Sequence, residues 1–380
     1  MSRKEEAVHP PLVFVHLGPE IPAYAHATVQ FAASRYEGKV FLLTDSEIPG
    51  KKGLRYFVEP IVTWYDRSAF LRFHDKSSLD PSFRHGFWFH VVERFFVLRQ
   101  FMDRFGADGL FHAELDVMVF DLEGVAEGCD QHGNGVFAVM DDPSRALASF
   151  FYVNSRKCFD HFLNFLVENA QSKNEMLTLG KFLQTVPACG HALPSDRFFD
   201  REAHPLSPSS VPDSLGLFDA NAFGQWLFGV DSRNLGGVSR NKFWNEMAKF
   251  PIDRLRFHLS LFSRRLSVSM KGGERRQLRT LHVHSKVTPR LSNYAVLLFY
   301  LLVNRLPLRI VVTGRRGHLS AVLLTSLLRG RGFAAASVLS RRYGALFVPI
   351  FRQLSHASTA PLSKRQQSRL QKLLSREKGR

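Results

Sequence analysis

The chain has 380 residues, a length that suits one large domain with an appendage rather than a single small domain. Hydrophobic residues make up 45% of the sequence, so a large core can be buried. We see no run of roughly 18–20 apolar residues that would form a transmembrane helix. The three cysteines, Cys129, Cys158 and Cys189, are widely spaced, so we expect neither a disulfide framework nor a structural zinc site. Without an apolar leader at the start, the sequence predicts a reducing, cytoplasmic setting.

Positive charge is concentrated toward the C-terminal end. The formal net charge is +17, and residues 251–380 hold 26 of the 51 Lys and Arg but only 3 of the 34 Asp and Glu. This asymmetry predicts contact with a polyanion, which could be anionic lipid, nucleic acid or a phosphorylated substrate.

The beginning of the chain predicts a parallel α/β sheet. Residues 12–17 (LVFVHL) form a short apolar run that ends at a glycine and a proline, which is typical of a buried strand. Residues 23–35 fit a helix, and residues 40–44 fit a second buried strand that ends at Asp45. Strand, helix and strand within about 35 residues indicate a βαβ unit.

The clearest helix is predicted over residues 91–105, where apolar residues recur at three- and four-residue spacing while polar residues occupy the other face. Residues 110–120 fit a strand with an acidic interruption. Further elements are predicted as a strand over 136–140, helices over 159–168 and 175–184, a loop over 195–217, a helix over 218–228 and a short strand over 281–284.

Two carboxylates interrupt the apolar segment FHAELDV at residues 111–117. Glu114 and Asp116 are spaced i, i+2, which places both side chains on the same face of a strand. The ligand crevice of an open α/β sheet lies at the carboxyl ends of its strands, and carboxylates with substrate phosphates favour Mg²⁺ or Mn²⁺. The segment therefore indicates a metal-diphosphate site, and the alternative is a strand end whose carboxylates are simply hydrated.

The late segment LHVHSK places His282 and His284 on one face of a strand. Imidazole can ligate Mn²⁺, and Lys286 beside it can neutralise phosphate. The alternative is a polar strand edge with a solvated histidine. We expect His284 to be the more important ligand because it adjoins Ser285 and Lys286.

Asp219 stands at the start of the segment FDANAFGQWLFG, where a predicted helix begins. One interpretation is that its side chain caps the helix. The other is that it is an acceptor-site carboxylate that acts as a general base.

These motifs, taken in order, resemble those of bacterial GT-A-type glycosyltransferases from polysaccharide gene clusters. The resemblance implies an α/β fold with a mostly parallel, Rossmann-like central sheet flanked by helices. It implies a catalytic domain over residues 1–289, followed by a basic, mainly helical extension over 290–380. The matching segments lie within residues 12–287 and are VFVHLG, VFLLTD, residues 95–109 with FHAELDVMVF, FDANAFGQWLFGVDSRN and LHVHSK.

In such enzymes a sugar passes from a nucleotide-diphosphate donor to an acceptor hydroxyl on a saccharide or a lipid-linked acceptor. The resemblance implies that Glu114-Leu115-Asp116 is the DxD element, with Glu in its first position, and that His284 or His282 completes a Mn²⁺ or Mg²⁺ site.

The resemblance also implies donor contacts outside the metal site. Asp45 would contact the nucleoside, and Arg94 and Lys286 would approach the diphosphate. The alternatives are that Asp45 only ends its strand in a turn and that Arg94 lies on a solvated helix face.

Two other functions remain open from the sequence. A nucleotidyltransferase also pairs carboxylates with metal, but it would usually carry a Gly-rich phosphate loop after the first strand. A membrane- or nucleic-acid-binding protein without enzymatic activity would leave both motifs unexplained.

We expect residues 290–380 to hold the enzyme on an anionic membrane surface at the inner face of the cell membrane. Apolar stretches such as 295–303 alternate there with pairs of arginines. Nucleic-acid binding is not expected, because few aromatic residues accompany the basic ones. The alternative is that the apolar stretches pack on the catalytic domain.

Overall fold

The computed structural model describes residues 9–18, 20–46, 53–195, 211, 213–224, 255–260, 265–270, 275–283 and 309–311. In chain order they form β1 (Leu12–His16), α1 (Ala23–Ala33), β2 (Val40–Thr44), β3 (Phe57–Pro60), α2 (Ser68–Lys76), α3 (Phe87–Arg104), β4 (Leu110–Ala113), β5 (Val117–Val119), α4 (Val125–His132), β6 (Val136–Asp142), β7 (Arg145–Val153), α5 (Arg156–Glu168), α6 (Glu175–Thr185), β8 (Gly190–Leu193), β9 (Leu217–Phe218), β10 (Leu255–Ser260), β11 (Leu266–Met270), β12 (Arg275–His282) and β13 (Arg309–Val311), with short 3-10 turns at Ile61–Thr63 and Asp213–Leu215.

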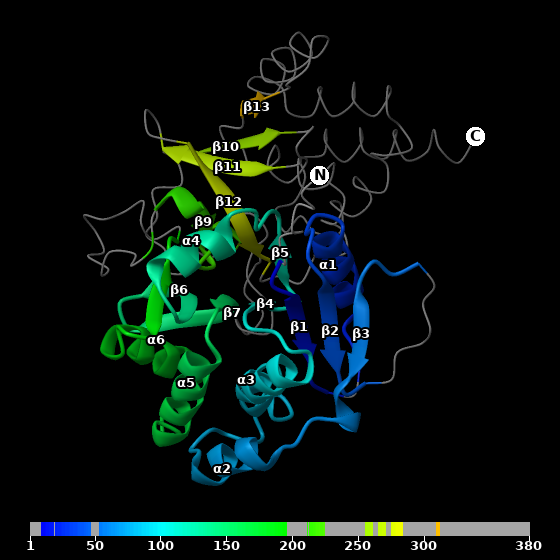
Figure 1. Cartoon of the computed structure of the whole chain (residues 1–380), viewed down its shortest axis with the longest axis vertical. Helices are drawn as coiled ribbons and strands as arrows, with labels where there is room; N and C mark the ends of the chain where they lie inside the picture. The colour runs from blue at the N-terminus through cyan, green and yellow to red at the C-terminus, as the bar shows by residue number, and fades with distance from the viewer. Residues whose placement is uncertain are drawn as a thin grey trace, which may run out of the picture.

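The larger sheet has seven strands in the order β3-β2-β1-β4-β7-β6-β8 (Figure 1). β1 pairs in parallel with β2 and β4, β2 with β3, and β6 with β8, while β7 runs antiparallel to both β4 and β6. The sheet is therefore mainly parallel, which confirms the predicted α/β class. β2 and β4 are buried along their whole length, as expected of strands covered on both faces.

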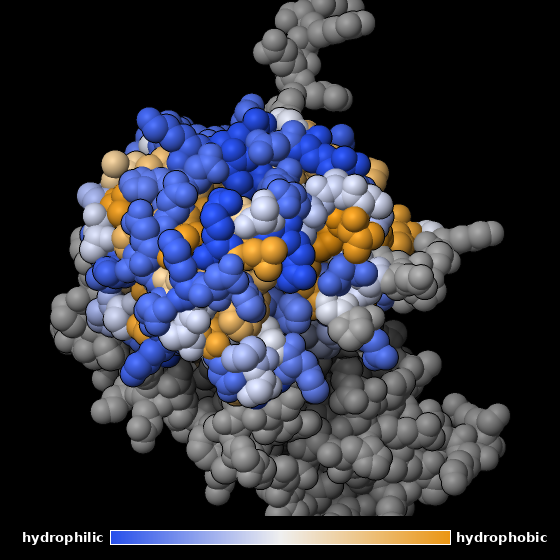
Figure 2. Space-filling model, turned by 90° about the horizontal axis from the view of Figure 1, so that it is seen from below, coloured by the Kyte–Doolittle hydropathy of each residue, from blue (hydrophilic) through white to orange (hydrophobic). Residues whose placement is uncertain are grey.

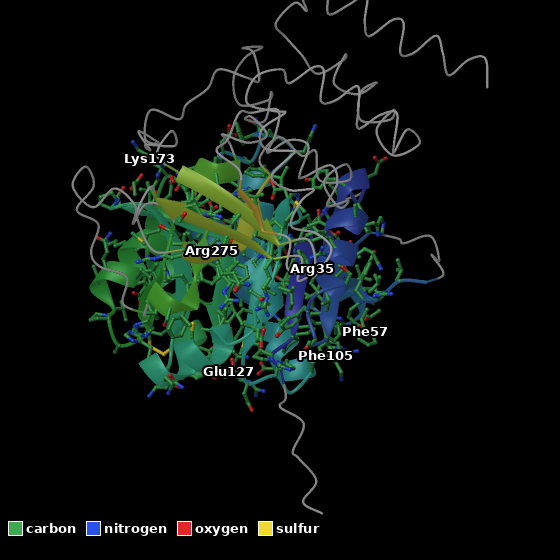
Figure 3. All side chains as sticks on the ribbon, turned by 90° about the horizontal axis from the view of Figure 1, so that it is seen from above. Arg35, Phe57, Phe105, Glu127, Lys173 and Arg275 are labelled. Carbon is green, nitrogen blue, oxygen red and sulfur yellow. A yellow bond between two sulfur atoms is a disulfide. The ribbon has the colours of Figure 1, made fainter. Side chains whose placement is uncertain are left out.

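Two hydrophobic clusters cover the two faces of this sheet. Val13 of β1 packs with α2, α3, α5 and α6, whereas its neighbours Leu12 and Phe14 pack with α1 and α4. The alternation follows from the two-residue repeat of a strand. At the β3 edge, the buried Phe41 stacks on Phe57 and also contacts Phe105. Phe57 and Phe105 are themselves exposed at the surface (Figure 3).

The smaller sheet joins the late part of the chain to the centre of the molecule. Its order is β13-β10-β11-β12-β5, and β9 pairs with β12 off this path. β12 runs antiparallel to β5, with Thr280 opposite Val119 and His282 opposite Val117. This sheet lies at the opposite end of the molecule from α2 (Figure 1).

Two predicted elements need correction because of this second sheet. Residues 110–120 are not one strand: β4 belongs to the larger sheet and β5 to the smaller one, and the chain turns between them. The helix predicted over 218–228 starts too early, because Leu217–Phe218 pairs with β12 and the described helical residues begin at Ala222. Pairing with a distant strand therefore overrides the local helical pattern.

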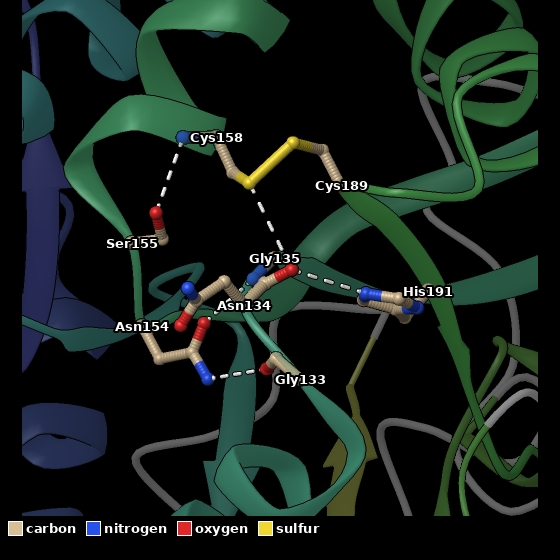
Figure 4. Close-up of a disulfide and its surroundings, with 8 residues drawn as sticks. All are labelled: Gly133, Asn134, Gly135, Asn154, Ser155, Cys158, Cys189 and His191. Carbon is tan, nitrogen blue, oxygen red and sulfur yellow. Dashed lines mark hydrogen bonds between the residues drawn. A yellow bond between two sulfur atoms is a disulfide. The ribbon is translucent and has the colours of Figure 1, made fainter.

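The cysteines were expected to form no disulfide framework, but two of them are bonded to each other. Cys158 in the first turn of α5 and Cys189 just before β8 form a disulfide, with their Cα atoms 5.2 Å apart (Figure 4). Cys129 is free and buried. The bonded cysteines are 31 positions apart in the sequence, and the chain between them runs through most of α5 and all of α6 before β8 pairs with β6. The cysteine spacing therefore no longer supports a reducing setting.

The described surface and helices bear on the predicted membrane contact. The face in Figure 2 is largely hydrophilic, with separate apolar patches. Among the described residues, no helix is both long enough and apolar enough to cross a bilayer. Of the basic segment 290–380, the structure describes only Arg309–Val311, which forms β13 beside β10. The helical character of that segment and its membrane contact stay predictions.

Candidate metal centre

Glu114 and Asp116 lie in the turn where the chain leaves the larger sheet for the smaller one. The backbone N–H of Val117 donates to the carbonyl of Glu114 at 3.0 Å, which closes the turn. The N–H of Glu114 donates to the carbonyl of Ser149 on β7 at 2.8 Å. Both carboxylates are thus held at the carboxyl end of β4, the edge where a parallel sheet places its ligands.

His282, at the end of β12, meets these two carboxylates. Its Nε2 atom lies 3.3 Å from Asp116 Oδ2 and 3.9 Å from Glu114 Oε2. One ligand atom from each of the three residues lies within 4.8 Å of the others. Asp116 and His282 are buried, while about a quarter of the Glu114 side chain is exposed. Two carboxylates and one imidazole are ligands that suit Mn²⁺ or Mg²⁺.

Strand pairing brings together these ligands from distant parts of the sequence. β12 lies antiparallel to β5, and the N–H of Val283 donates to the carbonyl of Asp116 at 2.7 Å. This register sets His282 beside Asp116. Of the two predicted histidines, the structure describes His282 and places it with the carboxylates; His284 and Lys286 lie outside the described residues, so their roles stay predictions.

Asp219 is buried and links a neighbouring turn to the ligand strand, which is β12, the strand that ends at His282. Its Oδ1 accepts from the N–H of Phe223 at 3.0 Å, and its Oδ2 accepts from the N–H groups of Gly224 at 2.8 Å and His282 at 3.0 Å. The contacts to Phe223 and Gly224 agree with the capping interpretation. The contact to His282, unforeseen from sequence, makes Asp219 a support for the ligand strand, while its role as a general base stays a prediction.

Gly224 shows how closely the turn and the ligand strand approach. A Cβ atom at this position would lie 1.6 Å from the carbonyl oxygen of His282 and 3.0 Å from Asp219 Oδ2. Only a residue without a side chain can occupy this position without moving the backbone. The glycine in the FDANAFG segment could be seen in the sequence, but its close approach to the distant His282 could not.

Arg94 is not on a solvated helix face, contrary to one interpretation of the sequence. Its side chain is 8% exposed, and Nη1 donates to Glu114 Oε1 in a close ion pair. Glu93, also assigned to the polar face, is buried and paired with Arg67 through two hydrogen bonds of 2.6 and 2.9 Å. α3 is enclosed by α2, α5 and the sheet, so its polar residues must find partners inside the protein.

Asp45 and His16 form a second polar group, which lies at the carboxyl ends of β1 and β2. The exposed Asp45 carboxylate accepts from the N–H of Gly18 at 2.9 Å, a contact that fits the turn interpretation. It also faces His16: burial lowers the pKa of His16, and the Asp45 charge opposes that shift. His90 on α3 acts on His16 as well. Sequence reasoning missed both histidines, although His90 stands one helical turn before Arg94.

Comparisons with known proteins give low structural similarity and no sequence match. No family model matches the chain, and no curated protein does. A structure of mouse xyloside xylosyltransferase 1 is similar at 11% identity and a TM-score of 0.36, with 51% of this chain and 90% of that chain covered. A structure of the PaToxG glycosyltransferase is similar at 12% identity and a TM-score of 0.31, with 47% and 70% covered. The functional argument therefore rests on the site itself.

Proposed function

We propose that this protein is a metal-dependent glycosyltransferase that moves a sugar from a nucleotide-diphosphate donor to an acceptor hydroxyl. The observation that carries the proposal is the convergence of Glu114, Asp116 and His282 within 4.8 Å at the carboxyl end of β4. A hydrated strand end, the alternative for the carboxylates, does not account for a buried aspartate 3.3 Å from a buried imidazole. A shared cation accounts for it, because it relieves the repulsion between the carboxylates.

When bound, a divalent cation supplies the positive charge that stabilises a leaving diphosphate. Glu114, Asp116 and His282 would hold the cation. Before a cation binds, Arg94 orients the Glu114 carboxylate through their ion pair. Asp219 holds the backbone of His282, so that the imidazole is positioned before the donor arrives.

The donor nucleoside would lie along the carboxyl ends of β1 and β2, beside Asp45 and His16. The proposed acceptor is a saccharide or a lipid-linked saccharide, as in polysaccharide or glycolipid biosynthesis. A nucleotidyltransferase remains the nearest alternative enzyme. It is less well supported because β1 is followed by a single glycine, Gly18, rather than by a glycine-rich loop.

Hydrolysis of nucleotide sugars in the presence of Mn²⁺, compared between wild type and Asp116→Asn, tests the proposal. We expect wild type to hydrolyse at least one donor only when Mn²⁺ is present, and Asp116→Asn to lose both this activity and the rise in melting temperature that Mn²⁺ causes. The substitution is nearly isosteric, so the metal-free melting temperature should change little. Full activity in Asp116→Asn would show that the metal assignment is wrong.

We further propose that residues 290–380 hold the protein at an anionic membrane surface. The proposal rests on their charge and apolar stretches. Because Arg309–Val311 pairs with β10, a matched truncation should end after Val311 rather than at residue 289. Sedimentation with anionic vesicles should be strong for the full chain and weaker for this truncation, which lacks the arginine pairs after residue 311. Equal sedimentation of both would contradict the contribution of residues 312–380.

A further inference from the structure

A buried carboxylate that the proposed chemistry does not use lies close to the metal centre. Glu175 is the first residue of α6, where Asn174 caps the helix through the N–H of Leu177 at 3.0 Å. The Glu175 side chain is buried, and within the described part of the chain its Oε2 atom has no hydrogen-bond partner. An unpaired carboxylate oxygen in the interior is costly, so its retention calls for a reason beyond helix capping.

A small cavity lies beside Glu175. Its apolar lining residues are Phe73, Leu79, Val92, Leu166 and Ala170, and its other polar ones are Asn169, Ser172, Asn174 and Thr178. Burial raises the pKa of Glu175 to about 7, the Arg94 charge lowers it, and the Glu114 charge raises it. Both members of the Arg94–Glu114 pair therefore lie within electrostatic reach of Glu175.

Arg94 carries the complementary group. Its Nη1 donates to Glu114, but among the described residues its buried Nε has no hydrogen-bond partner. A guanidinium has five N–H donors in a planar fork, so it can bind a second carboxylate without releasing the first. α3 and α6, which carry Arg94 and Glu175, are in contact. Two helices in contact thus carry a buried unpaired donor and a buried unpaired acceptor, and the Arg94 charge acts on Glu175.

A cation at the metal centre changes which anion is available to pair with the Arg94 guanidinium. A divalent ion bound by Glu114 competes with Arg94 for the same carboxylate and adds positive charge beside the guanidinium. Arg94 is enclosed and cannot turn to solvent, so it needs another anion nearby. Glu175 is the described buried carboxylate whose environment includes both charges.

We propose that Glu175 is a positioning residue that takes up the Arg94 guanidinium when a divalent cation engages Glu114. The inference rests on the proposed metal centre at Glu114, Asp116 and His282. In the metal-free protein Arg94 holds Glu114, and in the metal-bound protein Glu175 holds Arg94. Glu175 thereby lets the cation share Glu114 without leaving a buried arginine unpaired.

The test is the Mn²⁺ affinity of the full chain, measured by electron paramagnetic resonance of the free ion, together with metal-free stability in urea. Glu175→Gln keeps the shape of the side chain and removes its charge. We expect its Mn²⁺ affinity to fall by about 10-fold or more, as for other groups that support metal ligands. Its metal-free stability at pH 8 should be equal to or above that of wild type, because a charge that is unfavourable to bury has been removed. A purely structural role would not lower metal affinity while preserving stability.

Three comparison variants separate the effect of the Glu175 charge from effects of cavity packing. Thr178→Val alters the same cavity wall one turn along α6 and should leave Mn²⁺ affinity within twofold of wild type. Glu175→Asp keeps the charge and should retain more affinity than Glu175→Gln. In an Arg94→Gln background, Glu175→Gln should cause little further loss, because Glu175 acts through Arg94.

The outcomes separate this proposal from the proposed function. If Asp116→Asn loses Mn²⁺ binding while Glu175→Gln binds within twofold of wild type, the metal centre stands and the Glu175 proposal is overturned. Equal losses in Glu175→Gln and Thr178→Val would overturn it as well, since cavity packing would then be the cause. If wild type and Asp116→Asn bind Mn²⁺ alike, the metal centre fails and the role of Glu175 fails with it.

Discussion

Replacing Asp219 with asparagine tests how the ligand strand is supported. The Asp219 carboxylate accepts three backbone hydrogen bonds, from Phe223, Gly224 and His282. Asparagine has one oxygen and one NH₂ group in their place, and the NH₂ group cannot accept. If the amide nitrogen takes the Oδ1 position, Phe223 loses its acceptor; in the other orientation, both Gly224 and His282 lose theirs.

At least one buried donor therefore remains unpaired in Asp219→Asn. A hydrogen bond to a charged group is worth about 1.5–3 kcal/mol, and leaving its buried partner unpaired costs about 1–3 kcal/mol. We expect a loss of about 2–4 kcal/mol in the free energy of unfolding. At an ordinary helix cap, asparagine replaces aspartate at little cost, so the extra loss would come from the tertiary contacts.

Urea denaturation without metal, followed by far-ultraviolet circular dichroism, measures this loss. Asp80→Asn is a suitable control, because Asp80 is exposed and accepts from Ser82 within a turn at 2.8 Å. It should leave the urea midpoint almost unchanged. A stability of Asp219→Asn as close to wild type as that of Asp80→Asn would refute the anchoring role. Unchanged stability and donor affinity with turnover lowered by orders of magnitude would favour the general-base hypothesis instead.

Three further predictions concern the centre and its surroundings. Gly224→Ala should lower the free energy of unfolding by about 1–3 kcal/mol and weaken Mn²⁺ binding, as measured by urea titration and calorimetry, because its Cβ would meet the His282 carbonyl at 1.6 Å. His282→Ala should lower Mn²⁺ affinity in the same calorimetric assay, while the stability of the metal-free protein is largely kept. Unchanged affinity would remove His282 from the site. Glu175 has a folded-state pKa raised from 4.5 to about 7, so its ionisation should reduce stability as pH rises through this window, by up to about 3 kcal/mol above pH 7. Urea midpoints of wild type and Glu175→Gln at pH 5 and pH 8 check this, and parallel pH dependence in both proteins would contradict it.

Local sequence pattern was sufficient for several elements of the fold. The apolar runs of β1 and β2 and the three- and four-residue spacing in α3 predicted these elements to within a few residues of their observed bounds. Such patterns succeed because an enclosed strand or helix must present apolar side chains at its own repeat. The start of α3 was misplaced, at residue 91 rather than Phe87, because its first turn has no distinct polar face.

Other features depended on contacts that no local pattern records. The Cys158–Cys189 disulfide, the division of residues 110–120 between two sheets and the assignment of Leu217–Phe218 to a strand follow from pairings between separate segments. The burial of Arg94 has the same origin, since the residues that enclose it come from other helices.

The same distinction between local pattern and tertiary contact applies to the candidate site. Its carboxylates were recognisable in sequence, because the i, i+2 spacing of Glu114 and Asp116 is a local property. The tertiary structure decided that His282 joins them, through the pairing of β12 with β5, and that Asp219, Arg94 and Glu175 surround them. Sequence alone could identify the types of ligand, because chemistry is carried by individual side chains. Their convergence depended on strand register across more than 160 residues, which is fixed only when the two sheets pack.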